Sequence, residues 1–377
     1  MAKGAYIGVG GVAHKIKKGY IGVDGIARKI KKAYIGVGGV ARPFWSGGEL
    51  AYYGTGTALS SNRNDMGATS VGGYAIFAGG KTSASFSDVV TTVDAYDASL
   101  TRKSASALNR AAATLSAASI GDYAIFAGGY YYSGGYKYPL EATAYNTSLT
   151  KSTPTALTYN SLSATSVGGY AIFGGDSKCT GACAYNASLT LSAVSANRTG
   201  VNSATTVGNY ALFGGGNNSS GMTQAYVDTY DTSLTKGTAT DLSNARKNIA
   251  ATKVGNYALF AGGYNALSYN NVDVYDASLT KSAATALSAK RHNLSAINIE
   301  GYAIFAGGSL SIGTGDQYAM SQVDVYDESL VKSTMTALNT ARGLIASAKV
   351  GSYALFAGGI NQETETSYST VDVYIVA

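Results

Sequence analysis

The sequence predicts an all-β chain folded as a seven-bladed β-propeller, and three observations carry this prediction. A block built around a Gly-Gly pair occurs seven times, glycine (48) and tyrosine (30) are abundant while proline (3) is rare, and the two ends of the repeat array complement each other. Tight turns between strands of aromatic and β-branched residues produce such a composition. The 46% of hydrophobic and 13% of charged residues are typical of a globular protein.

The repeated block sets the size of the structural unit. Each copy reads Tyr-Ala-(Ile or Leu)-Phe and runs into the glycine pair, and the copies start at Tyr74, Tyr123, Tyr170, Tyr210, Tyr257, Tyr302 and Tyr353. The first glycines of successive pairs lie 40 to 51 residues apart. This period fits a four-stranded blade and is too long for a leucine-rich or ankyrin repeat.

Each copy divides into four strands, which we name a to d. In the fifth copy, a two-residue turn of the hairpin type, Gly255-Asn256, separates the first two strands. A variable loop follows strand b, and a five-residue link follows strand c. The expected strands are Lys247–Val254, Tyr257–Gly263, Asn271–Asp276 and Ser282–Leu287.

The two ends of the array predict how the ring closes. The chain ends on a strand c, Val371–Ala377, and no strand d follows it. At the front, Leu50–Leu59 has the pattern of a strand d with no strand a, b or c before it. Together the two fragments complete one blade in a 3+1 closure, which pairs both chain ends and hides the sheet edges.

The glycine pair, the later Val-Asp-Val-Tyr-Asp segment and an arginine after strand d resemble the kelch repeat over residues 50–377. The resemblance implies the same propeller. One feature departs from the kelch pattern, which has a tryptophan about seven residues after the strand-c tyrosine. This chain has small polar residues there, namely Ser104, Ser152, Ser282 and Ser333. We therefore expect a thinner outer strand and assign no kelch subfamily.

The N-terminal segment is a second repeat system with a different charge. Residues 1–48 hold nine basic side chains and one acid (Asp24), a net of +8, whereas the whole chain carries +6, so the other 329 residues carry about −2. The segment repeats every 14 residues, and Val23-Asp-Gly-Ile26 reads as a hairpin turn. We predict a short β-hairpin repeat segment at 1–48 and the propeller at 49–377.

The basic segment resembles short repeats at the ends of phage and prophage structural proteins. This resemblance favours an anchor that docks to other virion proteins or associates with further copies of the chain, since so small a unit cannot bury a core alone. A nucleic-acid contact and a solvated strand face are the alternatives, and the nucleic-acid contact is the less favoured. The expected anchor residues are Lys15, Lys17, Lys18, Arg28, Lys29, Lys31 and Lys32.

The loops between strands b and c form the expected binding face. They vary in length and are rich in Tyr, Ser, Asn and Gly, a composition that suits adaptable binding loops, although unconstrained surface variation would look the same. The a–b turns and c–d links at the other end of the blades hardly vary. The expected ligand-contacting tyrosines are Tyr131, Tyr136, Tyr138, Tyr264, Tyr269 and Tyr318.

An arginine recurs shortly before strand a, on the same face by chain polarity. Six guanidinium groups around one opening would hold carboxylates, sulfates or phosphates. The alternative, which the kelch resemblance implies, is that each arginine binds backbone carbonyls of the next blade. The arginines lie 11 to 13 residues before the strand-b tyrosine: Arg63, Arg110, Arg198, Arg246, Arg291 and Arg342.

Other chemistry finds little support. Cys179 and Cys183 are spaced to face each other across a turn, as a disulfide outside the cell or as two thiols inside it. The chain has two histidines, His14 and His292, and we expect no metal site and no cofactor. The recurring strand-c aspartates read as structural. Irregular-loop carboxylates (Asp316, Glu363 and Glu365) are the remaining catalytic candidates.

These observations lead to a functional hypothesis. We expect a non-enzymatic phage or prophage virion protein, a tail or head fibre or decoration protein on the virion surface, whose propeller binds a surface glycan or protein. An intracellular kelch scaffold that recruits protein partners is the first alternative, and a propeller hydrolase or isomerase is the second. The chain has no run of 18 apolar residues and no apolar segment at its start, so we expect neither a membrane span nor a signal peptide.

Overall fold

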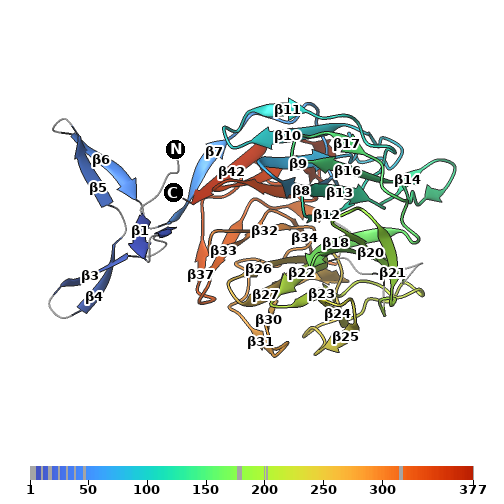
Figure 1. The fold of residues 1–377 in the computed structure, drawn as a ribbon. Coiled ribbons are helices and arrows are strands. Elements are labelled where there is room, and N and C mark those ends of the chain that lie inside the picture. Colours follow the sequence, from blue (N-terminus) through green and yellow to red (C-terminus); the bar gives the residue numbers. More distant parts are fainter. Residues whose placement is uncertain are drawn as a thin grey trace.

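The computed structural model describes the backbone of six strands between residues 6 and 45, and the residues 48–175, 181–198, 200, 203–313 and 317–376. Every regular element in these residues is a β-strand. Seven four-stranded antiparallel sheets follow one another around a ring, so the protein is a seven-bladed β-propeller, as predicted (Figure 1). The described part of the chain has no helix with the length and apolarity that a membrane crossing requires.

Each blade contributes one strand of each kind. The a strands are β8 (Gly67–Val71), β12 (Ser116–Ile120), β18 (Ser161–Val167), β22 (Ser203–Val207), β26 (Ala250–Val254), β32 (Ser295–Ile299) and β38 (Ala346–Val350). The b strands are β9 (Tyr74–Ala78), β13 (Tyr123–Ala127), β19 (Tyr170–Gly175), β23 (Tyr210–Gly214), β27 (Tyr257–Ala261), β33 (Tyr302–Ala306) and β39 (Tyr353–Ala357). The c strands are β10 (Val93–Asp97), β16 (Ala142–Asn146), β20 (Ala182–Asn186), β24 (Val227–Asp231), β30 (Val272–Asp276), β36 (Val323–Asp327) and β42 (Val371–Val376). The d strands are β11 (Arg102–Ser104), β17 (Lys151–Ser152), β21 (Leu191–Val194), β25 (Lys236–Ala239), β31 (Lys281–Ala283), β37 (Lys332–Thr334) and, in the closing blade, β7 (Leu50–Thr55).

The a strands form the inner wall of the ring. Each of them contacts the a strand of the blade before and after it, and β38 of blade 7 contacts β8 of blade 1. The ring closes where β42 pairs with β7, with Tyr374 opposite Tyr52 and Val376 opposite Leu50. The predicted 3+1 closure is therefore confirmed.

The outer strands are shorter than the sequence suggested. In blade 5, β31 ends at Ala283, four residues before the expected end. The chain then turns inward, because Leu287 is buried and its N–H donates to the carbonyl of Asn270 at 2.9 Å. On the inner side, β26 begins at Ala250, and Lys247 forms only an isolated bridge with Tyr264.

The b strands supply the core of every blade. Their Ala-(Ile or Leu)-Phe segments are essentially inaccessible to solvent, as in Ala303, Ile304 and Phe305. In each blade the strand-b phenylalanine meets the strand-c tyrosine edge to face, with ring centroids 5.6 to 6.0 Å apart. Burial of two large aromatic rings and their quadrupole contact stabilise each blade, which explains why the same residues recur.

The glycine pair joins neighbouring blades. Gly307 and Gly308 have φ of 62° and 111°, a region that side-chain-bearing residues avoid. A Cβ on Gly307 would lie 2.6 Å from the carbonyl oxygen of Arg342 in the next blade. The N–H of Gly308 donates to that same oxygen at 2.9 Å. In blade 4 the equivalent pair is Gly215-Gly216, one residue later than the sequence repeat suggested, because Gly214 replaces the alanine of strand b.

The variable loops and the arginine-bearing connections share one face, as chain polarity predicted. In six blades an isolated bridge joins the connection to the b–c loop of the same blade: Asn64 to Lys81, Ala113 to Tyr130, Gly200 to Asn217, Lys247 to Tyr264, His292 to Ser309 and Gly343 to Ile360. Four of the loops form small hairpins: β14 (Tyr131–Tyr132) with β15 (Tyr136–Lys137), β28 (Tyr264–Asn265) with β29 (Leu267–Ser268), β34 (Ser309–Ser311) with β35 (Gln317–Ala319), and β40 (Ile360–Asn361) with β41 (Thr366–Ser367).

The N-terminal repeats form three hairpins, which Figure 1 shows beside the ring. They are β1 (Tyr6–Val9) with β2 (Val12–Lys15), β3 (Gly19–Val23) with β4 (Ile26–Ile30), and β5 (Ala33–Val37) with β6 (Val40–Trp45). Val23 pairs with Ile26 across the predicted turn. The side chains of the anchor residues lie outside the described part of the structure, and the division of the chain near residue 48 stays a prediction.

Candidate functional site

Four of the six arginines are buried structural groups. Arg63, Arg246, Arg291 and Arg342 are 0% exposed. Each pairs with the aspartate on strand c of its own blade: Arg63 with Asp94, Arg246 with Asp273, Arg291 with Asp324 and Arg342 with Asp372, at 2.5 to 2.9 Å. The guanidinium groups also donate to strand-b carbonyls or to the loops beside them, as Arg291 does to Phe305 at 3.2 Å.

These contacts correct the expected ring of six ligand-binding arginines. Burial puts four guanidinium groups out of reach of a ligand, and it lowers the pKa of Arg291 while the Asp324 carboxylate opposes that shift. The structural alternative also needs a correction. The guanidinium binds carbonyls of its own blade, and it is the backbone carbonyl of the arginine that accepts a hydrogen bond from the neighbouring blade.

Arg110 occupies a different position from the buried arginines. In blade 2 the carbonyl that accepts the glycine N–H of the preceding blade belongs to Ala112, at 2.9 Å from Gly80. Ala112 therefore takes the buried arginine position, and Arg110 lies two residues earlier with half of its side chain exposed. The strand-c aspartate is replaced by Thr143, whose hydroxyl accepts the N–H of Asn109 at 3.0 Å. Blade 2 thus lacks the buried pair and presents its arginine to solvent.

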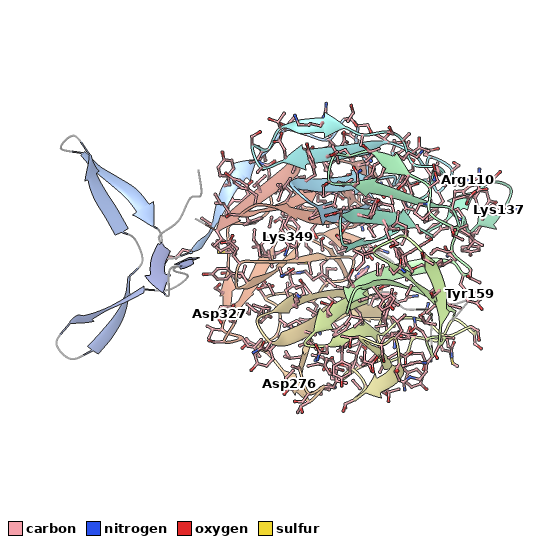
Figure 2. All side chains as sticks on the ribbon, in the orientation of Figure 1. Arg110, Lys137, Tyr159, Asp276, Asp327 and Lys349 are labelled. Atoms are coloured by element: carbon pink, nitrogen blue, oxygen red, sulfur yellow. The ribbon has the colours of Figure 1, made fainter. Side chains whose placement is uncertain are left out.

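Arg110 lines a shallow cleft at the rim of blade 2. Its guanidinium lies over the ring of Tyr131, 5.4 Å from the centroid, and its Nε is 3.4 Å from Glu141. The cleft encloses about 420 Å³, and its other lining residues are Lys137, Tyr138, Pro139 and Leu140. Figure 2 shows Arg110 and Lys137 at the same edge of the propeller. Two cations, one carboxylate and two tyrosine rings can bind a polar ligand that carries a flat or apolar face.

An aromatic cluster lies beside this cleft. Phe86 of the blade 1 loop contacts Tyr130 and Tyr136 of the blade 2 loop, with centroids 5.3 and 5.8 Å apart, and Tyr136 also contacts Tyr132. Tyr132 and Tyr136 remain 48% and 50% exposed. Their backbones are tied together as well, because the Tyr132 N–H donates to the Phe86 carbonyl at 3.0 Å. The two loops therefore present preorganised aromatic surface.

Comparisons with known proteins bear on the fold. No protein-family model matches the sequence, and no curated protein matches it. Among solved structures, one titled "Structure of YjhT" aligns with a TM-score of 0.57 at 11% identity, over 83% of this chain and 95% of that chain. The likeness is one of fold alone. The kelch and phage resemblances accordingly rest on the residues quoted for them.

The other predicted tyrosines do not join the Arg110 cleft. Tyr131, Tyr136 and Tyr138 belong to blade 2, whereas Tyr264 and Tyr269 belong to blade 5 and Tyr318 to blade 6, on another part of the ring. Tyr264 lies against His292, 5.1 Å between centroids, and both Tyr264 and Tyr269 are only partly exposed. Tyr318 is 39% exposed on the β34–β35 hairpin.

Among the six recurring arginines, Arg198 is the second that is partly exposed. Its Nε donates to Asp228 at 2.7 Å, and its guanidinium lies over the ring of Tyr226 at 4.4 Å. Asp228 also accepts the Arg198 N–H and lies 3.6 Å from Lys236. The strand-c aspartate thus holds this arginine at the rim. The side chain of Arg198 is 32% exposed, compared with 50% for Arg110.

The remaining candidates give no second site in the described residues. His292 is buried, and burial lowers its pKa to about 4. Cys183 is buried in β20, and Cys179 lies outside the described residues, as does Asp316. The N–H of Glu363 donates to Asn361 in an exposed turn with Glu365. The described residues contain no group of three His, Cys, Asp or Glu side chains that could hold a metal ion.

The residues of the cleft and cluster that were not predicted as site residues are Phe86, Tyr130, Tyr132, Lys137, Pro139, Leu140 and Glu141. One signal was available for Arg110. The four buried arginines all lie 11 residues before the strand-b tyrosine, whereas Arg110 and Arg198 lie 13 and 12 before it. Arg110 and Arg198 therefore do not stand at the position that the buried arginines occupy, which Ala112 takes in blade 2, so the spacing separates buried from exposed arginines.

Proposed function

We propose that this protein is a non-enzymatic binding protein of a phage or prophage particle. Its propeller binds a surface glycan or protein at the loop face around Arg110, and its basic N-terminal repeats dock to other proteins of the particle. The observation that carries the binding role is the Arg110 cleft with its aromatic cluster. It lies in a blade that has lost the buried arginine–aspartate pair and gained exposed aromatic and charged groups instead.

The composition of this surface supports recognition. Tyrosine rings supply large contact area at low cost in side-chain entropy, and Arg110, Lys137 and Glu141 supply directional charge at the edge of the rings. The hydroxyl groups of a glycan can bind the charged groups while a sugar ring stacks on a tyrosine. A protein ligand would use the same aromatic side chains as anchors.

A non-enzymatic role is supported by the environment of His292, the one histidine whose side chain the structure describes. His292 is 2% exposed, its Nδ1 lies 2.9 Å from Ser268 Oγ, and it is packed against Tyr264. A general base must reach the proton that it removes. The strand-c aspartates are also buried and ion-paired. These groups therefore serve the fold.

The binding role is tested with a glycan array and with surface proteins of candidate host cells as probes. Arg110→Ala and Tyr136→Ser should each weaken binding by ~2 kcal/mol, as central interface residues do. Tyr53→Ser is the matched control, since Tyr53 is 56% exposed on the outer strand β7. Binding that survives both changes but is lost in Tyr318→Ser would move the site to blades 5 and 6. Turnover of a bound glycan would support a hydrolase instead.

The docking role is tested separately. A chain without residues 1–48 should bind the propeller ligand normally but should be missing from purified particles. Normal incorporation of this chain into particles would contradict the anchor. Failure to find any particle would favour the intracellular scaffold.

A further inference from the structure

The next-to-last residue of each a strand lies at one level around the axis of the ring, near its a–b end. In four blades this residue is a serine or threonine whose hydroxyl links neighbouring inner strands. Ser119 Oγ donates to the Ser70 carbonyl at 2.5 Å, Ser166 Oγ to the Ser119 carbonyl at 2.5 Å, and Thr206 Oγ1 to the Ser166 carbonyl at 3.1 Å. Ser70 Oγ donates to the Lys349 carbonyl at 2.7 Å. In blades 1 to 4 this position therefore holds the inner wall together.

Blades 5 to 7 break this series. Their next-to-last residues are Lys253, Asn298 and Lys349, which are long and polar or cationic. Lys349 Nζ donates to Asn298 Oδ1 at 3.3 Å, and Figure 2 shows Lys349 in the middle of the propeller. The three residues come from adjacent inner strands, β26, β32 and β38, which contact one another in order. Asn298 thus stands between two lysines.

The two lysines are not neutralised by partners in the described structure. Ion pairs occur at many other lysines, but neither Lys253 nor Lys349 pairs with a described carboxylate. Burial lowers the pKa of Lys349, the Lys253 ammonium lowers it further, and Glu300 in the nearby a–b turn opposes both effects. Glu300 is exposed and accepts a hydrogen bond from Ser352 Oγ at 3.1 Å. Two like charges thus repel each other at the centre of a body whose net charge is about −2.

We propose that Lys253, Asn298 and Lys349 form a binding site for a small tetrahedral oxyanion, a phosphate or sulfate group, at the a–b end of the ring axis. Two ammonium groups can donate to different oxygens of one anion, and the Nδ2 group of Asn298 can donate to a third while its Oδ1 keeps Lys349 in place. The anion would also remove the repulsion between the lysines. Lys253 is exposed, so the site is open to solvent.

This site is independent of the Arg110 cleft, which lies at the opposite end of the blades. The anion can be free in solution or be an ester group on a larger molecule, since both present the same oxygens. It would add a second ligand to the propeller on the face whose loops hardly vary between blades.

The test is the thermal stability of the full chain in chloride, sulfate, inorganic phosphate or methyl phosphate at constant ionic strength, followed by calorimetric titration. Because the ionic strength is constant, general screening of charges is the same in every salt. The wild-type midpoint should rise with phosphate and sulfate. Lys253→Met and Lys349→Met should each weaken anion binding by about tenfold or more, the effect of losing one charge-assisted hydrogen bond. The matched control is Lys103→Met, an exposed lysine on β11 that pairs with Asp97.

Each outcome has a clear meaning. Methyl phosphate that binds as tightly as phosphate identifies the site as one for ester groups, whereas binding of the inorganic ions alone identifies it as one for free anions. The proposal is overturned if the wild type shows no specific response, or if Lys253→Met responds like the wild type. Lys253 is exposed, so its replacement tests the site even if Lys349→Met fails to fold.

Discussion

The arginine–aspartate pairs should show a strong asymmetry between their two partners, and blade 6 is the best place to measure it. Asp324 accepts the Ser288 N–H and Oγ–H, each at 3.0 Å, pairs with Arg291 at 2.9 Å and lies 3.3 Å from Lys332. Arg291, in contrast, has only the Phe305 carbonyl as a further described acceptor. Removal of the arginine should therefore reduce the folding free energy less than removal of the aspartate does.

The magnitudes follow from these contacts. Removal of one partner of a buried ion pair costs about 3 to 5 kcal/mol of folding free energy. Arg291→Ala should lie near the lower value, because Asp324 keeps its Ser288 and Lys332 contacts. Asp324→Ala should lie near the upper value, because it leaves a guanidinium that is 0% exposed with a single carbonyl. The double variant should cost less than the sum of the single variants by ~2 kcal/mol.

The assay is guanidinium-induced unfolding followed by far-ultraviolet circular dichroism. The single tryptophan, Trp45, lies in the N-terminal hairpins and would not report on the blades. Arg110→Ala is the control, and loss of its half-exposed pair with Glu141 should cost under about 1 kcal/mol. A larger loss of folding free energy in Arg291→Ala than in Asp324→Ala would contradict the asymmetry, and so would losses in both variants no larger than in the control.

Two further predictions follow from the fold. Deletion of residues 1–45 should leave a folded propeller, whereas deletion of 1–60 removes β7 and leaves the edge of β42 unpaired, so that chain should aggregate. Equal thermal midpoints and solubility of the two truncated chains would refute the role of β7 in closure. The second prediction concerns His292, whose pKa burial lowers from about 6.5 to about 4, so the unfolded chain binds a proton at a higher pH than the native protein does. The stability that this group contributes is present above pH 6.5 and is lost as the pH falls towards 4, by about 3 kcal/mol in total. His292→Gln should remove this part of the pH dependence, and identical stability curves for the two proteins between pH 7 and 4 would contradict it.

The sequence predicted the fold because its repeats report local requirements that each blade meets in the same way. A glycine is needed wherever a Cβ would clash with a backbone carbonyl of the next blade, as a Cβ at position 307 would clash with the carbonyl of Arg342. A phenylalanine and a tyrosine recur because each blade buries the same edge-to-face pair. The unpaired strand d at the front implied the closure, since a sheet edge requires a partner.

The site was less predictable, because exposure depends on contacts between blades. The sequence placed the tyrosine-rich loops and the arginines on one face, but it treated six arginines alike. Burial of Arg342 and exposure of Arg110 depend on which residue accepts the glycine hydrogen bond of the neighbouring blade. Phe86 joins the cluster from another blade, and no local pattern marks it.

The sequence by itself determined the number of blades, their strand order and the mode of closure, since these follow from repeats whose period and turn chemistry are local. Only the tertiary structure decided which polar groups are free to act. Lys253 and Lys349 are 96 positions apart in the chain, yet their strands flank the same strand, β32, because successive blades place their inner strands side by side. Burial and charge repulsion depend on neighbours in space, and the packing of blade against blade sets those neighbours.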